Sequence, residues 1–209
     1  MWAVVPLKSP ERAKTRLAGC LNPAQRRQLS FELAARTIAA LQATPAIDTV
    51  AVVTASAEIA AFVQARGARP LLQADDTGTA SAFAAAIAQL QALKLDRLLM
   101  IAGDLPLISP TALQALCAPC EGIDVTIVPD RHRVGTNALL CAPPDALAPC
   151  FGERSFERHL AAARAANLRV RVLEIDALAL DLDEPADLEA LRRCGDGDIR
   201  GIGGRIVPG

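Results

Sequence analysis

The sequence has few lysines and few histidines for its length. Only three of the 22 cationic side chains in 209 residues are lysine, and the chain has two histidines. Neither the histidines nor the cysteines supply an obvious nucleophile–base pair, so covalent catalysis through such a pair is not expected. The net charge is −1, which gives no overall attraction to nucleic acid or to a membrane surface.

Several binding signatures and targeting segments are also missing. No GxxxxGK[ST] motif occurs, which excludes a P-loop as the phosphate cradle. The glycines at 201–204 follow a predicted helix rather than a strand, which argues against a dinucleotide-binding fingerprint. The amino terminus begins directly with a strand-like run, and no apolar stretch reaches the roughly 18 residues that span a membrane. We therefore expect a cytoplasmic protein.

The six cysteines fit the same expectation. Without a secretory signal they predict reduced thiols rather than a disulfide framework. Cys117 and Cys120 form a CxxC pair, but no second pair and no histidine cluster accompanies it. A zinc or redox role for this pair is therefore not favoured.

Short β-rich runs alternate with longer alanine-rich stretches, and this alternation predicts an α/β fold. We predict helices at 23–41, 56–66, 79–93, 110–117, 155–166 and 185–193. Strands are predicted at 2–5, 49–54, 69–72, 97–102, 125–128, 138–141, 170–173 and 179–182. Strands separated by helices imply one domain over 1–194, with a mostly parallel central sheet covered by helices on both faces. The stretch 125–183 is less regular and leaves room for antiparallel pairing, and 195–209 is predicted to be a flexible tail.

The rare lysines are concentrated after the first predicted strand. Lys8 and Lys14 fall there together with Arg16. In open α/β sheets, ligands bind at the carboxyl edge of the strands, and both lysine and arginine bind phosphate. The segment therefore predicts a site for a polyanionic phosphate ligand, although a solvated basic loop would have the same composition.

Carboxylates follow two other predicted strands. Asp104 stands in Gly103-Asp104-Leu105-Pro106, where a buried strand ends at the same sheet edge as Lys8. Asp181 and Asp183 are two residues apart, so in an extended segment they share one face while the leucines at 180 and 182 pack the other way. Mg²⁺ binds through one or two carboxylates together with substrate phosphates. These aspartates therefore predict a metal–phosphate site, whereas the simpler interpretations are a turn aspartate and a helix cap.

Polar residues at two further points could hold a second anion. Thr136 and Asn137 begin an apolar strand, and Gly152 precedes a predicted helix on which Ser155 is placed as the N-cap. A helix N-terminus attracts anions through its backbone N–H groups and its dipole. A capping serine is the simpler interpretation of Ser155. His159, one turn into this helix, is expected to be structural.

Five separated motifs, taken together, resemble a known family. They occur in this order: Pro6-Leu7-Lys8 with Lys14-Thr15-Arg16-Leu17, Gly103-Asp104-Leu105-Pro106, Gly135-Thr136-Asn137-Ala138-Leu139, Phe151-Gly152-x-x-Ser155-Phe156-x-x-His159, and Leu180-Asp181-Leu182-Asp183-x-Pro185-x-Asp187-Leu188. Their order and spacing over about residues 1–190 resemble the 2-phospho-L-lactate guanylyltransferase family of deazaflavin coenzyme biosynthesis.

The resemblance implies a nucleotidyltransferase-type, Rossmann-like fold and transfer of GMP from GTP to the phosphate of a three-carbon acid, with release of pyrophosphate. Family members differ in using phospholactate, phosphoenolpyruvate or phosphoglycerate. The matching positions imply a set of roles: Lys8, Lys14 and Arg16 for the triphosphate; Asp104, Asp181 and Asp183 for Mg²⁺, with two ions expected; and Thr136, Gly152 and Ser155 for the acceptor, with Asn137 and Arg154 beside them.

Two positions depart from the family pattern. Arg154 stands where the family commonly has a small residue, and a guanidinium there could accommodate a differently placed carboxylate or phosphate, such as that of 3-phosphoglycerate. Residues 77–81 are Thr-Gly-Thr-Ala-Ser, whereas the family tends to have Leu-Asn near residue 79. The resemblance implies that this segment contacts the guanine or the ribose. Two other functions remain open from the residues alone: a metal-dependent glycosyltransferase using a nucleotide sugar, and a non-catalytic nucleotide-binding module. We expect small-molecule partners and allow for a homodimer.

Overall fold

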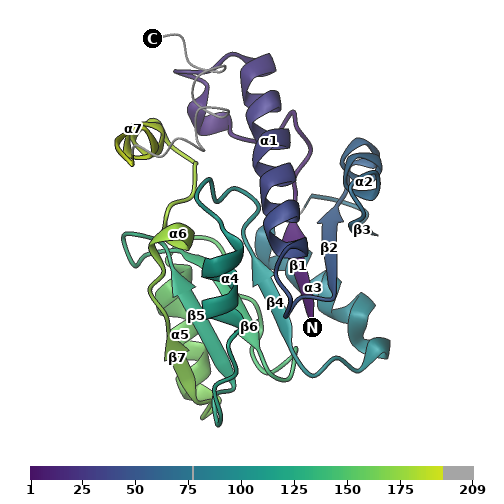
Figure 1. Cartoon of the computed structure of the whole chain (residues 1–209), viewed down its shortest axis with the longest axis vertical. Helices are drawn as coiled ribbons and strands as arrows, with labels where there is room; N and C mark the ends of the chain where they lie inside the picture. Colours follow the sequence, from purple (N-terminus) through teal and green to yellow (C-terminus); the bar gives the residue numbers. More distant parts are fainter. Residues whose placement is uncertain (77, 195–209) are drawn as a thin grey trace.

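A computed structural model describes residues 1–76 and 78–194. A seven-stranded sheet forms the centre of the molecule, with strand order β3-β2-β1-β4-β6-β5-β7 (Figure 1). The strands are β1 (Trp2–Pro6), β2 (Thr49–Thr54), β3 (Arg69–Leu72), β4 (Leu98–Ile101), β5 (Val125–Pro129), β6 (Thr136–Cys141) and β7 (Val170–Val172). This architecture confirms the predicted single α/β domain. The predicted tail, 195–209, and Thr77 of the divergent segment lie outside the described residues.

One strand runs against the others. β1 pairs in parallel with both β2 and β4, β2 pairs in parallel with β3, and β5 with β7. β6 is antiparallel to its neighbours β4 and β5, as the irregular stretch after residue 125 allowed. Its direction brings the start of β6 to the edge where β4 and β5 end. Residues 136 and 137 therefore lie beside the segment that carries Asp104.

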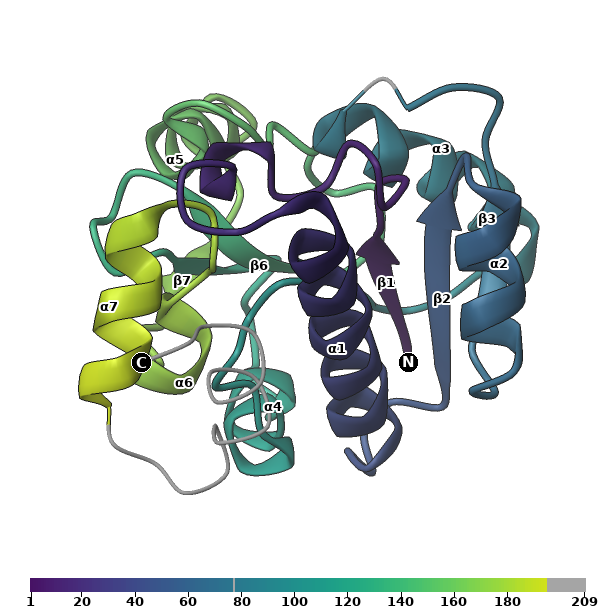
Figure 2. The same ribbon diagram turned by 90° about the horizontal axis from the view of Figure 1, so that it is seen from above.

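The central strands are buried on both faces, and alternate side chains enter two different cores. Val5, Val52 and Ile101 face a core completed by α1 (Pro23–Gln42), α2 (Ala57–Gln64) and α4 (Pro110–Cys117). Val4 and Met100 face a second core completed by α3 (Thr79–Leu90) and α5 (Ser155–Ala165). Figure 2 shows these two helical layers on opposite sides of the sheet. This two-residue alternation is that expected of a sheet covered on both faces.

A third apolar cluster lies where the N-terminal loop meets the C-terminal part of the chain. Leu17 and Leu21 follow the basic segment, residues 8–16, and they pack with Leu29 and Leu33 of α1. Leu180 and Leu182 complete the cluster with residues of α7 (Pro185–Arg193). The two leucines therefore turn away from Asp181 and Asp183, as predicted from their spacing.

The predicted strand over 179–182 is wrong. The short helix α6 (Asp176–Ala179) occupies the beginning of this range, and an extended segment without strand pairing follows it. Leu180 and Leu182, whose spacing suggested a strand, pack in the third apolar cluster instead. The other predicted strands and the six predicted helices are present, with ends shifted by up to three residues. Among the described residues, no helix combines the length and the apolar character needed to cross a membrane.

Candidate active site

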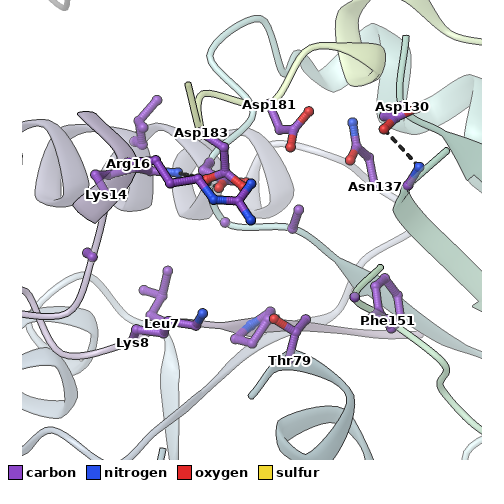
Figure 3. Close-up of a pocket in the computed structure, with 18 of the residues that line it drawn as sticks. Leu7, Lys8, Lys14, Arg16, Thr79, Asp130, Asn137, Phe151, Asp181 and Asp183 are labelled. Carbon is purple, nitrogen blue, oxygen red and sulfur yellow. Dashed lines mark hydrogen bonds and ion pairs between the residues drawn. The ribbon is translucent and has the colours of Figure 1, made fainter. Parts of the chain in front are cut away.

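One cavity of about 760 Å³ brings together all the residues singled out from the sequence. It lies at the carboxyl edge of β1 and β4, where open α/β sheets bind their ligands. In the close-up, Asp181 and Asp183 lie on one side of the cavity, while Lys8 and Thr79 lie on the other (Figure 3). The predicted residues that line it are Lys8, Lys14, Arg16, Asp104, Thr136, Asn137, Gly152, Arg154, Ser155, Asp181 and Asp183.

Backbone contacts explain why residues so distant in sequence meet here. The Ala102 N–H donates to the Asn137 carbonyl at 2.8 Å, and the Leu182 N–H donates to the Asp104 carbonyl at 3.2 Å. At Gly103, a Cβ atom would lie 2.5 Å from Leu7 Cδ2 and 3.0 Å from a methyl of Val5. A larger residue at this position would displace the Leu7 side chain, so glycine favours the close approach between the ends of β1 and β4.

Lys14 lies between two of the three predicted metal-binding carboxylates. Its Nζ donates to Asp104 Oδ2 at 2.5 Å and to Asp183 Oδ1 at 3.1 Å, and its side chain is only 7% exposed. The backbone of Lys14 adopts a left-handed conformation, with φ 55°, which starts the short 3₁₀ helix Thr15–Leu17. Burial alone would lower the pKa of this lysine, but the charges of Asp104 and Asp183 outweigh it and raise the pKa. The lysine is therefore a cation held against two carboxylates.

The acidic segment, residues 181–184, carries two aspartates that differ in pKa. Burial and the charges of Asp104 and Asp183 raise the pKa of Asp181 to about 7. Burial acts in the same direction on Asp183, but the Lys14 ammonium outweighs it and holds the pKa of Asp183 below its usual value. Lys14 thus compensates Asp183 and Asp104, whereas Asp181 has no cationic partner in the part of the chain that the structure describes.

The donor set fits a divalent cation in its chemistry. Within 1–76 and 78–194, no group of three or more Asp, Glu, His or Cys side chains is already close enough to hold a metal, and Lys14 Nζ lies between Asp104 and Asp183. Hard divalent cations prefer carboxylate oxygens. Burial first, and then the charges of Asp104 and Asp183, raise the pKa of Asp181, and a bound cation would offset both effects by stabilising the charged carboxylate. Asp104, Asp181 and Asp183 are therefore suited to hold a metal once the lysine gives way.

The start of α5 differs in one respect from the sequence-based interpretation. Ser155 is not the N-cap: it is the first residue of the helix, and Arg154 caps it with φ 50°. The Ser155 N–H donates to the Gly152 carbonyl at 3.1 Å, which closes a tight turn. Gly152 has φ 117° and open space around a would-be Cβ, so its backbone conformation, rather than crowding, requires glycine. The exposed Arg154 donates to Glu157 Oε2 at 2.5 Å.

Thr136 belongs to a buried polar chain behind the cavity wall. Its Oγ1 lies 3.0 Å from Nδ1 of His159, and the Cys150 N–H donates to Nε2 of the same ring at 2.8 Å. The His159 ring is fully buried and makes an edge contact with Phe151. Burial and the nearby Arg158 lower the pKa of His159 to about 4. The imidazole is therefore neutral at physiological pH.

A second set of polar residues fixes the acidic segment, and the sequence motifs assigned no role to most of them. Asp187 Oδ2 accepts from the Asp183 and Glu184 N–H groups at 2.9 and 2.6 Å, and Oδ1 accepts from Arg131 at 2.6 Å. The Arg131 N–H also donates to the Ala179 carbonyl at 2.8 Å. Asp187 had a weak signal, since it falls three residues after Glu184, where a capping acid is expected.

Two more residues position the loop between β5 and β6. Asp130 accepts from the N–H groups of His132, Val134 and Gly135 at 2.8 to 3.0 Å, and it lines the cavity (Figure 3). The Asn137 amide donates to the Leu178 and Ala179 carbonyls at 2.9 and 3.2 Å. Its amide nitrogen is thus engaged with the backbone that leads to Asp181. Arg12, Thr79 and Phe151 also line the cavity and were not predicted as site residues.

Comparisons with known proteins show the family to which the chain belongs. The family model described as "Guanylyl transferase CofC like" matches residues 1–200. A phosphoenolpyruvate guanylyltransferase of Conexibacter woesei is 39% identical over 91% of this chain and 86% of its own length. A protein of the same name from Sphaerobacter thermophilus is 40% identical over 90% of this chain and 91% of its own.

Among solved structures, a nucleotidyl transferase from Methanothermobacter thermautotroptrophicus aligns with a TM-score of 0.66. It is 18% identical, and the alignment covers 96% of this chain and 98% of the other. At this identity the likeness concerns the fold alone. The family model and the two close relatives go further, and the chain belongs to the CofC-like guanylyl transferase family.

Proposed function

We propose that this protein transfers GMP from GTP to the phosphate of a phosphorylated three-carbon acid. An oxygen of the acceptor phosphate attacks the α-phosphorus of GTP, the bond from that phosphorus to the oxygen bridging to the β-phosphate breaks, and pyrophosphate leaves. The observation that carries the proposal is one cavity that combines the basic segment, three carboxylates and the Thr136–Gly152–Ser155 wall in a chain of this family.

Charge balance supports this assignment. A nucleoside triphosphate and a phosphorylated carboxylate together carry roughly seven negative charges at neutral pH. Lys8 and Arg16 offset about two of these charges, and Lys14 offsets part of the charge of the carboxylates that it contacts. Two Mg²⁺ ions, held by Asp104, Asp181 and Asp183, would neutralise four more and polarise the phosphoryl oxygens. The acceptor phosphate is already a competent nucleophile, so the protein needs no side-chain base, and catalysis consists of positioning and charge stabilisation.

Phosphoenolpyruvate is the first acceptor to test, because the two relatives at 39 and 40% identity carry that acid in their names. Arg154 is the reason to test 3-phosphoglycerate and 2-phospholactate beside it. Its guanidinium is exposed at the cavity and, within residues 1–76 and 78–194, is paired only with the exposed Glu157, so it is available to a second anionic group of the acceptor. Replacing Arg154 with glycine should shift the ratio of kcat/KM values among the three acids, and an unchanged ratio would contradict this role.

The proposed reaction makes a phosphate anhydride joining GMP to the acid, an activated intermediate consistent with a cytoplasmic step of deazaflavin coenzyme biosynthesis. The experiment is ³¹P NMR of a reaction with GTP, Mg²⁺ and one acid. Two new coupled phosphorus signals in the anhydride region, together with free pyrophosphate, are expected. A glycosyltransferase would leave GTP intact and cleave a nucleotide sugar instead, and a non-catalytic module would change neither.

A further inference from the structure

His159 and Thr136 form a buried pair that the proposed reaction does not yet use. Thr136 opens β6 at the cavity wall and is 6% exposed, and His159 lies on α5 with 0% exposure. Their Nδ1 and Oγ1 atoms are 3.0 Å apart. Distance alone does not say which of the two atoms donates the hydrogen, because a hydroxyl and a neutral imidazole can each do either.

The other ring nitrogen decides the direction. Nε2 accepts the Cys150 N–H at 2.8 Å, so Nε2 carries a lone pair and no proton. A neutral imidazole has one N–H, which must then be on Nδ1. The low pKa of the buried ring agrees with a neutral state. The Nδ1–H group therefore donates to Thr136 Oγ1, with the Ser155 carbonyl, one helical turn back, as a second acceptor near the ring.

This direction has a consequence for the cavity. Once Thr136 Oγ1 accepts from His159, its own hydroxyl hydrogen still needs an acceptor, and among the described residues His159 is the one side-chain partner recorded for this oxygen. A buried donor without an acceptor costs about 1–3 kcal/mol. Carboxylates and phosphates only accept hydrogen bonds at neutral pH. A hydroxyl donor at this wall can form a hydrogen bond to an anionic group of the acceptor acid. In the opposite tautomer, with Nδ1 unprotonated, the Thr136 hydroxyl would instead donate its hydrogen to Nδ1.

We propose that His159 is a positioning residue: held in its Nδ1–H tautomer by the Cys150 backbone, it fixes the Thr136 hydroxyl as a hydrogen-bond donor to the anionic group of the acceptor acid. The inference rests on the proposed function for the identity of that acid. The tautomer and the direction of the hydrogen bond rest on the geometry alone.

The first arm of the test observes the ring directly. The chain has two histidines, so two-bond ¹H–¹⁵N correlation spectra of the ¹⁵N-labelled protein at pH 7 contain two imidazoles, and His132→Asn identifies the exposed one. A protonated Nδ1 and an unprotonated Nε2 are expected for His159. A ring protonated on Nε2, or on both nitrogens, would overturn the proposal whatever reaction the protein catalyses.

The second arm separates positioning from a merely structural role. His159→Gln can still accept from Cys150 but loses the contact with Thr136, and His159→Asn places an amide donor near the former Nδ1 position. We expect His159→Gln and Thr136→Val each to raise the KM for the acceptor acid about ten- to a hundredfold, or about 1.4–2.8 kcal/mol, with the KM for GTP nearly unchanged. His159→Asn should recover most of the loss.

The double variant gives the deciding comparison. If His159 acts through Thr136, His159→Gln combined with Thr136→Val should be no worse than Thr136→Val alone. Additive losses, or equal effects on the KM values of GTP and the acid, would refute the positioning role. Wild-type protein that releases no pyrophosphate with any of the three acids would refute the proposed function instead, and the NMR arm would still decide the tautomer.

Discussion

Replacing Lys14 with methionine should make the protein bind divalent cations more tightly in the absence of nucleotide. The lysine ammonium occupies the position between Asp104 and Asp183, at 2.5 and 3.1 Å from their oxygens. A Mg²⁺ ion on the same oxygens, at its usual distance of about 2.1 Å, would lie within roughly 4 Å of that ammonium. The two cations therefore compete for the same carboxylates.

The size of the effect follows from this distance. Two unit charges about 4 Å apart interact by about 1 kcal/mol even at the dielectric constant of bulk water, so a divalent ion loses about 2 kcal/mol beside the lysine. At about 1.4 kcal/mol per factor of ten, removing the ammonium should tighten binding by about 30-fold. A lower effective dielectric constant in this partly buried site would increase the factor.

Isothermal titration with Mn²⁺ at pH 8, without GTP, measures the effect directly. Lys8→Met is the matched control, because Lys8 lines the same cavity and removes the same charge, but it is exposed and has no ion pair among the described residues. Its affinity for Mn²⁺ should change only a few-fold. If Lys14→Met binds Mn²⁺ no more tightly than Lys8→Met, the lysine does not compete with a metal, and our interpretation of the carboxylates is wrong.

Three further predictions test other parts of the site. Asp104→Asn should lose most turnover while its circular dichroism spectrum stays that of the wild type, and near-normal pyrophosphate release would refute a metal role for Asp104. Asp187→Asn should raise the Mg²⁺ concentration needed for half-maximal activity about tenfold or more, because Asp187 orients the backbone of the acidic segment. The exposed Glu189→Gln on the same helix, where Glu189 pairs with Arg193, serves as control, and equal values would argue against that role. The pKa of His159 falls from 6.5 to about 4 on folding, so the folded chain binds a proton more weakly at this residue than the unfolded chain does. The contribution of His159 to the free energy of unfolding should therefore be complete above pH 6.5 and fall by about 3 kcal/mol as the pH drops to about 4. Urea unfolding of the wild type and of His159→Gln at both ends of this range measures the difference, and parallel pH dependences would contradict the prediction.

Much of the fold could be predicted because its signals are local. Alternation of short β-branched runs with alanine-rich stretches identified the sheet and its helices, and the order of five motifs identified the family. The exception, 179–182, shows where such signals fail. Leu180 and Leu182 have strand-like spacing, but they pack on the third apolar cluster with Leu17 and Leu29. Periodicity reports which side chains are buried, not whether a neighbouring strand is present to pair with the backbone.

The candidate site was predictable as a set of residues but not as a network. Charge and position after a strand pointed to Lys14, Asp104 and Asp183, yet nothing local places the lysine between the two carboxylates, because these contacts join residues 90 and 169 positions apart. The capping of α5 by Arg154 rather than Ser155 depends on a left-handed backbone conformation that composition does not reveal. The direction of the His159 hydrogen bond depends on the Cys150 N–H, a backbone group with no sequence signature.

The central claim is guanylyl transfer to a phosphorylated acid, and release of pyrophosphate tests it most directly. Wild-type protein would be given GTP and Mg²⁺ with phosphoenolpyruvate, 2-phospholactate or 3-phosphoglycerate in separate reactions, and GTP alone as the blank. We predict pyrophosphate in a one-to-one ratio to acid consumed with at least one of the three, and none in the blank. Absence of pyrophosphate with every acid, from protein that still binds GTP, would contradict the account.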